Sequence, residues 1–172
     1  LLCGLMLALA LQVRAREIAD SQAEEIRISA NLLRESLDLL NASQRLSMVG
    51  GWAWNVETQT MYWTEEVYRI HDISPQEMAP GSPEHISRSA ECYGAEDRPV
   101  VLAAFQRCVE EGEPYDLELP FTTAKGRQLY IRTTARPVRE RGKVVRIIGN
   151  IMDTTERKRA EAELDSHRHH LE

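Results

Sequence analysis

The residue types that usually carry enzyme chemistry are sparse and scattered in this chain. Its three cysteines, Cys3, Cys92 and Cys108, lie far apart and form no Cys-x-x-Cys pair. Such spacing predicts neither a disulfide framework nor a zinc site. The sequence also has no glycine-rich phosphate loop, no His/Cys cluster with metal-ligand spacing and no nucleophile elbow. We therefore expect a non-catalytic segment without a metal site.

The most informative polar residues follow a β-branched, apolar run over residues 144–152. An Asp-Thr-Thr sequence ends that run, and a charged pattern typical of a helix begins without a loop. Asp153 and Glu156 have the spacing of a helix N-cap and a residue that reaches back to it. A direct strand-to-helix junction couples the two elements mechanically. We expect Asp153, Thr155 and Glu156 to transfer strain from the strand to the helix.

The composition is that of a folded protein with a modest negative charge. The 172 residues are 42% hydrophobic and 28% charged, and the formal net charge is −6. This balance is ordinary for a globular domain, whereas nucleic-acid binding usually leaves a basic footprint. The sequence predicts one domain with extensions and no nucleic-acid partner.

The first residues differ from the rest of the chain. Residues 1–13 are apolar except for Gln12, and Arg14 and Arg16 follow them. A helix needs about 20 apolar residues to cross a bilayer. We interpret residues 1–14 as the end of a truncated transmembrane helix, with the arginines on the cytoplasmic side. This interpretation makes the chain a cytoplasmic domain tethered to an inner or plasma membrane; a signal-peptide core and a buried helix are the alternatives.

Residues 15–48 predict one long signalling helix, because they contain neither proline nor glycine. Apolar residues recur there at alternating spacings of four and three, which is the seam of a coiled coil. They are Ala19, Ala23, Ile26, Ala30, Leu33, Leu37 and Leu40. Two interpretations stay open: an amphipathic helix packed on its own domain, or a parallel stalk that makes a homodimer through the flanking helices.

The middle of the chain reads as an α+β domain over residues 49–154. Two short strands, at 52–56 and 61–63, precede a proline- and glycine-rich stretch over 72–97 that indicates short helical turns. A longer helix is predicted over 99–111, followed by strands at 115–122, 129–138 and 144–152. This order predicts a five-stranded antiparallel sheet with short helices on one face. Pro120 indicates an edge strand or a bulge, and the β-branched last strand indicates a central one.

Five short motifs occur here in the order and spacing of a known family. They are Gly51-Trp52-Ala53-Trp54-Asn55, the run from Met61 to Ile70, Glu96-Asp97-Arg98, Gly126-Arg127 with Tyr130-Ile131-Arg132, and Gly149 to Lys158. Together they resemble a PAS domain, specifically the PAS fold-3-like subgroup with a Trp-rich first strand and a closing PAC motif, over about residues 40–165. Thr154 departs from the usual Ile, and Tyr93-Gly94-Ala95 stands where many members have His-Pro.

The resemblance implies a signal-sensing module of a bacterial-type, membrane-bound sensor. In this family a ligand, a cofactor or a neighbouring domain perturbs the sheet, and the flanking helices pass the change to an effector. Residues 155–172 resemble the linker helix that precedes a histidine kinase, as in two-component systems, or a diguanylate cyclase. A ligand-free dimerisation and relay domain is the alternative.

The resemblance also directs attention to a pocket and to possible cofactors. Haem-binding members use a histidine on the long helix, and residues 99–111 contain none, although His71 and His85 lie in the preceding region. Cys92 does not match the photoactive flavin motif, so we expect neither haem nor a covalent flavin, and no cofactor is required. The ligand considered is a small, planar or acidic molecule; Arg132 is the one basic residue placed near it, with a position outside the pocket, through strand alternation, as the alternative. The expected pocket residues are Trp52, Trp54, Tyr115, Leu117, Phe121 and Ile131.

Overall fold

The computed structural model describes residues 2–169, and the chain divides into two compact units, residues 1–42 and 43–172. The outermost ends of the predicted membrane segment, residue 1, and of the linker helix, residues 170–172, lie outside the described part.

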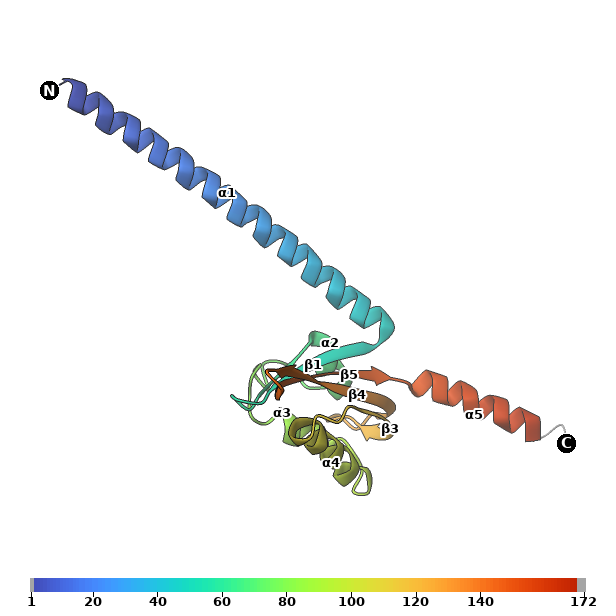
Figure 1. Ribbon diagram of the computed structural model, residues 1–172. Coiled ribbons are helices and arrows are strands. Elements are labelled where there is room, and N and C mark those ends of the chain that lie inside the picture. Colours follow the sequence, from blue (N-terminus) through green and yellow to red (C-terminus); the bar gives the residue numbers. More distant parts are fainter. Residues whose placement is uncertain (1, 170–172) are drawn as a thin grey trace. The chain divides into compact units, whose positions relative to one another are not determined.

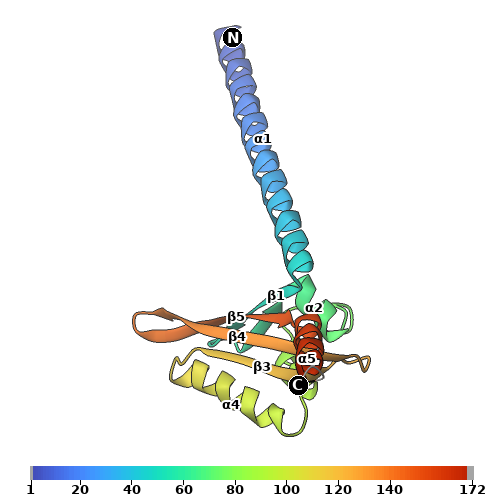
Figure 2. The same ribbon diagram turned by 90° about the vertical axis from the view of Figure 1, so that its right-hand side faces the viewer.

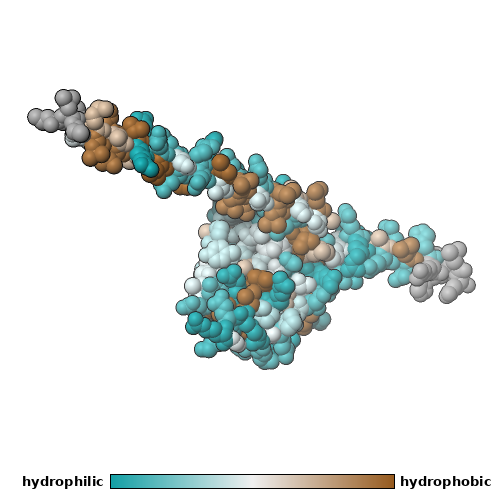
Figure 3. Space-filling model, turned by 45° about the horizontal axis from the view of Figure 1, so that its top comes forward, coloured by the Kyte–Doolittle hydropathy of each residue, from teal (hydrophilic) through white to brown (hydrophobic). Residues whose placement is uncertain are grey.

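The first unit consists of most of one long helix, α1 (Leu2–Ser47), as predicted for residues 15–48 (Figure 1). The helix also continues through the apolar start of the chain. Several seam residues are exposed along it, and hydrophobic side chains are visible on its surface (Figure 3). Within residues 2–169, no helix combines the length and the apolar character that crossing a membrane requires.

The second unit contains a five-stranded antiparallel sheet, which confirms the predicted fold class (Figures 1 and 2). The strands are β1 (Val49–Asn55), β2 (Thr60–Trp63), β3 (Tyr115–Thr122), β4 (Gln128–Glu140) and β5 (Lys143–Asp153), in the order β2-β1-β5-β4-β3. The β-branched strand β5 is central, and Pro120 lies on the edge strand β3, as the sequence predicts. An edge position tolerates proline because one side of the strand makes no ladder bonds.

Three helices connect β2 to β3: α2 (Glu65–His71), α3 (His85–Glu91) and α4 (Asp97–Glu110). Helix α4 lies against one face of the sheet (Figures 1 and 2). Alternation along β4 directs Leu129, Ile131, Thr133 and Ala135 into the interior, whereas Tyr130 on the opposite face is 44% exposed. The chain then leaves β5 directly into α5 (Thr155–His169).

Candidate functional site

An internal cavity of about 60 Å³ lies between the sheet and the three helices of the second unit. On this measure a water molecule needs about 10–15 Å³, so the cavity has room for roughly four to six waters. Its walls come from every strand of the sheet and from α2, α3 and α4; they are Trp52, Met61, Trp63, Val67, His71, Ile86, Ser89, Ala90, Tyr93, Val101, Leu102, Phe105, Tyr115, Thr133 and Ile151.

The cavity walls are mainly apolar and aromatic, and none of them carries an acidic side chain, a lysine or an arginine. The rings of Trp52 and Phe105 approach with centroids 6.1 Å apart. Leu102 is 38% exposed, which places it at the rim between the interior and solvent. The cavity therefore offers dispersion contacts and only a few neutral polar groups.

His71 is the titratable base in the cavity wall, and its hydrogen bonds fix its tautomer. Its Nδ1 lies 2.8 Å from the Val67 carbonyl oxygen, which can only accept, so Nδ1 carries the hydrogen. Burial lowers the pKa of His71 to about 4, so the ring is neutral near pH 7. Its bare Nε2 then accepts from the Ser89 hydroxyl at 3.0 Å, and the ring stacks on Trp63 with centroids 4.3 Å apart.

Three hydroxyl groups form a second polar cluster in the cavity wall. The Thr133 hydroxyl on β4 and the phenol groups of Tyr93 and Tyr115 all border the cavity, and Thr133 lies near enough to moderate the pKa of both tyrosines. Burial raises the pKa of each tyrosine well above its usual range, so both phenols stay protonated at every physiological pH. The cluster is a neutral set of donors and acceptors.

The two histidines considered as iron ligands both have their ring nitrogens engaged. His71 bonds Val67 and Ser89, as described. His85 is fully buried behind Trp63, with Nδ1 2.7 Å from the Ser82 carbonyl oxygen and Nε2 3.0 Å from the Tyr68 hydroxyl. A metal could take either nitrogen only by displacing one of these partners. Among residues 2–169, no group of three or more His, Cys, Asp or Glu side chains is arranged to hold a metal ion.

Of the six expected pocket residues, Trp52 and Tyr115 line the cavity. Trp54 packs edge-on against Phe105, with ring centroids 5.9 Å apart. The other three belong to the surrounding core: Phe121 and Ile131 are fully buried, and Leu117 packs against them while partly exposed. These three side chains pack in the hydrophobic core and do not line the cavity.

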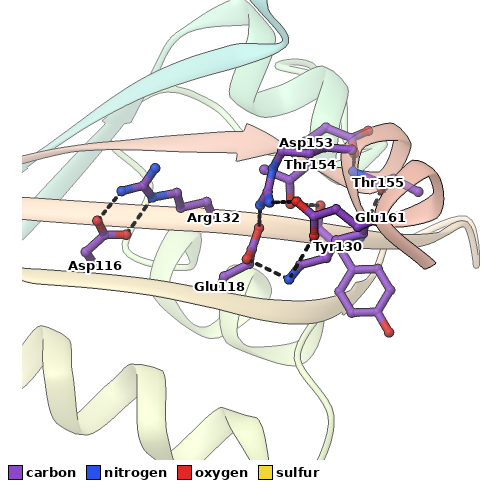
Figure 4. A network of polar contacts seen from close by, with 10 residues as sticks. Asp116, Glu118, Tyr130, Arg132, Asp153, Thr154, Thr155 and Glu161 are labelled. Atoms are coloured by element: carbon purple, nitrogen blue, oxygen red, sulfur yellow. Dashed lines mark hydrogen bonds and ion pairs between the residues drawn. The ribbon is translucent and has the colours of Figure 1, made fainter. Parts of the chain in front are cut away.

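Sequence reasoning missed the polar groups of the cavity, His71, Ser89, Tyr93 and Thr133, as pocket residues. Thr133 carried a usable signal, because it alternates with the buried Ile131 and Ala135. Arg132 points the opposite way and is paired with Asp116, at 2.7 Å from Nε to Oδ1 (Figure 4). The basic neighbour expected for an acidic ligand is therefore outside the cavity.

A second site lies where β5 becomes α5 and is built largely on the backbone of Tyr130 (Figure 4). The Tyr130 N–H donates to the Thr155 hydroxyl at 2.9 Å. The Tyr130 carbonyl accepts from the Thr154 N–H at 2.8 Å and from the Thr154 hydroxyl at 3.2 Å. Thr154, which replaces the family's usual Ile, thus adds a bond to β4. The start of α5 is fixed to the strand beside β5.

Asp153 accepts the Thr155 N–H through Oδ1 at 2.9 Å, which caps the first turn of α5 as the spacing predicts. The reach-back bond predicted for Glu156 is replaced, because the Asp153 N–H donates to the Met48 carbonyl oxygen at 3.1 Å, and Glu156 is exposed. Met48 is the residue between α1 and β1 and has a left-handed φ of 53°. One hydrogen bond therefore joins the exit from α1 to the entry into α5.

Charged side chains connect the same turn of α5 to the edge strand β3 (Figure 4). Glu118 forms ion pairs with Arg157 and with Lys158, the latter at 3.0 Å. Arg157 and Lys158 also pair with Glu161 one turn later. Lys158, with help from Thr154 and Arg157, lowers the pKa of Glu118 to about 2. We call this set of residues, Glu118, Tyr130, Asp153–Thr155, Arg157, Lys158 and Glu161, the junction.

Comparisons with known proteins agree with this architecture. The model of the PAS fold family (PAS_3) matches residues 60–151. The blue-light-activated histidine kinases of Brucella ovis and Brucella abortus are 29% identical over 127 residues, which is 74% of this chain. The chain spans about a quarter, 24%, of the length of those kinases.

Solved structures give the same result. A sensory box histidine kinase/response regulator from Burkholderia thailandensis is 28% identical, with a TM-score of 0.59 over 77% of this chain and 96% of that one. The N-terminal domain of a diguanylate cyclase with PAS/PAC sensor from Marinobacter aquaeolei is 19% identical, with a TM-score of 0.55 over 64% and 98% of the two chains. At that identity the second likeness shows the fold alone.

Proposed function

This chain belongs to the PAS family, and we propose that it is the non-catalytic signal-sensing module of a bacterial sensor whose output domain is a histidine kinase or a diguanylate cyclase. Histidine kinases are among the relatives that match in sequence, and the sensor domain of a diguanylate cyclase shares the fold. The input is occupancy of the cavity, and the output is a change at the start of α5.

One observation carries the proposal: the cavity wall and the cap of α5 are two residues apart on the same strand. Ile151 borders the cavity, and Asp153 caps the helix. Residues two apart on a strand point to the same face. Thr133, another cavity wall, pairs with Ile151, and Ile131 pairs with Asp153. A molecule that displaces Ile151 or Thr133 therefore acts on the strand end that positions α5.

The test is a pair of fusions, of residues 1–172 to a histidine kinase core and to a diguanylate cyclase core. Ala90 lines the cavity, so Ala90→Leu fills part of it; Ala103 on α4 is exposed, so Ala103→Leu adds the same atoms outside. We expect Ala90→Leu to change phosphate incorporation or cyclic dinucleotide production in at least one fusion. Ala103→Leu should leave both activities unchanged.

A second pair of variants tests the route of the signal. Asp153→Ala removes the oxygen that accepts the Thr155 N–H, whereas Asp153→Asn keeps an oxygen at that position. We expect the response to Ala90→Leu to disappear with Asp153→Ala and to persist with Asp153→Asn. Output that responds to Ala90→Leu equally in both backgrounds would contradict the proposed route.

The second candidate function is a ligand-free relay domain. The small cavity favours it, as does a core that Phe121, Ile131 and Ile147 fill at 0–1% exposure. A relay predicts that Ala90→Leu has no effect on either fusion, while Asp153→Ala still alters the output. The same set of variants thus separates the two functions.

The proposal includes a homodimer formed through the flanking helices and a membrane tether at residues 1–14. Ile26, Leu33 and Leu37 of the α1 seam are 49–69% exposed, which supports pairing with a second copy. Sedimentation of the wild-type chain and of Leu33→Glu tests the dimer. A species that stays monomeric at high concentration in the wild type would contradict it.

A further inference from the structure

The cavity is mainly apolar, but a few neutral polar groups border it. The hydrogen bonds of one of them, His71, are known. The hydroxyl hydrogen of Ser89 is committed to the bare Nε2 of His71, as the Val67 bond requires. The oxygen of Ser89 keeps lone pairs that can accept from a bound molecule. Helix α3 thus presents an acceptor at the cavity.

The tyrosine and threonine cluster presents the complementary group. Tyr93, Tyr115 and Thr133 bring three neutral hydroxyl groups to the cavity wall, which also includes apolar side chains of α4. A hydroxyl group can donate its hydrogen to a bound molecule, so this wall can supply a donor. The strand side of the cavity therefore adds a donor to the acceptor on α3.

Charge is what the cavity cannot accommodate. Its lining has no arginine, lysine or carboxylate to pair with an ion, and Arg132 is on the opposite face of the sheet with Asp116. Transfer of an unpaired carboxylate or ammonium ion from water into such surroundings is strongly unfavourable. Neutral hydroxyl and amide groups lose far less on the same transfer and regain hydrogen bonds inside.

We infer that the cavity selects a small uncharged molecule with an apolar body and one hydroxyl or amide end, and that it rejects carboxylates and ammonium ions of the same size. This inference rests on the proposed sensing function and names the ligand class of that site. The volume admits about four to six non-hydrogen atoms, taking each as roughly one water. A larger neutral ligand would displace Leu102 at the rim.

The test uses three probes of nearly equal size and different charge: 1-butanol, butyrate and butylammonium at pH 7.5. Binding to the chain of residues 1–172 is followed by methyl NMR shifts of Ile151 and Val101, which line the cavity, and by tryptophan fluorescence. We expect saturable shifts with butanol and at least tenfold weaker binding of both ions. Ala90→Leu should abolish the butanol shifts, and Ala103→Leu should keep them.

Butyrate or butylammonium that binds as tightly as butanol would overturn the ligand class, and so would shifts with butanol that do not saturate. Neither result decides the proposed function, because the fusions report separately whether filling the cavity changes output. Thermal unfolding of both alanine variants is the control for folding. If Ala90→Leu does not fold, Ser89→Ala, which removes the acceptor and adds no bulk to the cavity, replaces it and should weaken butanol binding at least threefold.

Discussion

Polar groups around the cavity and polar groups at the junction differ in both burial and charge. His71 and Thr133 are 1% and 4% exposed and neutral. At the junction, the side chains of Arg157 and Glu161 are 51% and 50% exposed and charged. We call the charged side chains of the junction the charged layer; they are Glu118, Arg157, Lys158 and Glu161. The junction also has a buried layer, Thr154 and Thr155, which are bonded to the Tyr130 backbone and are neutral.

The difference teaches how each region can respond to a signal. A buried hydrogen bond is costly to leave unmade, so the cavity discriminates between molecules but tolerates little rearrangement. An exposed ion pair contributes little and is screened by salt, so the charged layer can rearrange at small cost. We interpret the cavity as the selective end and the charged layer as the adjustable end.

The largest expected effect is a loss of packing beside the cavity. Phe121 is 1% exposed and packs edge-on against His71 and Tyr93, with ring centroids 5.1 and 5.2 Å away. Phe121→Ala should reduce the unfolding free energy by about 3–5 kcal/mol. Urea unfolding followed by tryptophan fluorescence measures it, because Trp52, Trp54 and Trp63 all lie in the second unit.

Tyr130→Ala is the control on the opposite face of the sheet. Its side chain is 44% exposed, and the junction uses only its backbone. The variant should lose less than about 1 kcal/mol. A loss as large as that of Phe121→Ala would break the proposed distinction between the interior and the junction.

The second effect is a pH dependence that only the buried region should show. The pKa of His71 falls from an ordinary 6.5 to about 4 on folding, so the unfolded chain binds the extra proton first. Stability is therefore full above pH 6.5 and falls as the pH drops toward 4, by about 2 kcal/mol between pH 8 and pH 5. Urea unfolding at the two pH values measures the loss.

His71→Gln removes the titrating group and should remove that part of the pH dependence. Its stability at pH 8 will be lower, since the bonds to Val67 and Ser89 change, but the difference between pH 8 and pH 5 should shrink by about 2 kcal/mol. An unchanged difference would show that His71 is not the buried base. Glu118 at the junction contributes little in this range, because its ordinary pKa of 4.5 and its pKa of about 2 in the folded chain both lie below pH 5.

Most of the fold was predictable because its signals are local: apolar and polar residues alternate along the strands, and proline and glycine mark where regular elements end or lie at an edge. The alternation of Leu129, Ile131 and Thr133 follows from the pleat of any half-buried strand, and Pro120 excludes a central position. Element ends were less accurate. The predicted helix at 99–111 begins at Asp97, because Pro99 occupies its first turn and not its first residue.

The candidate site was less predictable, because its geometry depends on contacts between distant segments. The cavity joins Ser89, Tyr93 and Thr133, and no local pattern gives the rotation of two short helices over a sheet. At the junction, the Asp153 cap followed from spacing, but the bonds to Tyr130 and Met48 required the strand order. Glu118 was missed because its partners are about forty residues later.

The third effect tests the buried layer of the junction. Thr155→Val keeps the shape of the side chain but leaves the Tyr130 N–H without the acceptor it has at 2.9 Å. The expected loss is about 1 kcal/mol, or roughly fivefold faster hydrogen exchange at the Tyr130 amide. Thr155→Ser keeps the hydroxyl and should retain the protection. Equal exchange in both variants would show that the hydroxyl does not hold α5 on β4.

The smallest effect belongs to the charged layer. Glu118→Gln removes the ion pairs with Arg157 and Lys158 and should cost less than Thr155→Val, with the loss diminishing in high salt. Because Lys158 lowers the Glu118 pKa from 4.5 to about 2, this stability is present above pH 4.5 and is lost as the pH falls toward 2. Glu156 is exposed in the same turn, so Glu156→Gln is the matched control. It should change neither the unfolding free energy nor its dependence on salt. Glu118→Gln could instead reduce the unfolding free energy as much as Phe121→Ala does, at every salt concentration. That result would mean that the charged layer is as rigid as the cavity and is not the adjustable end.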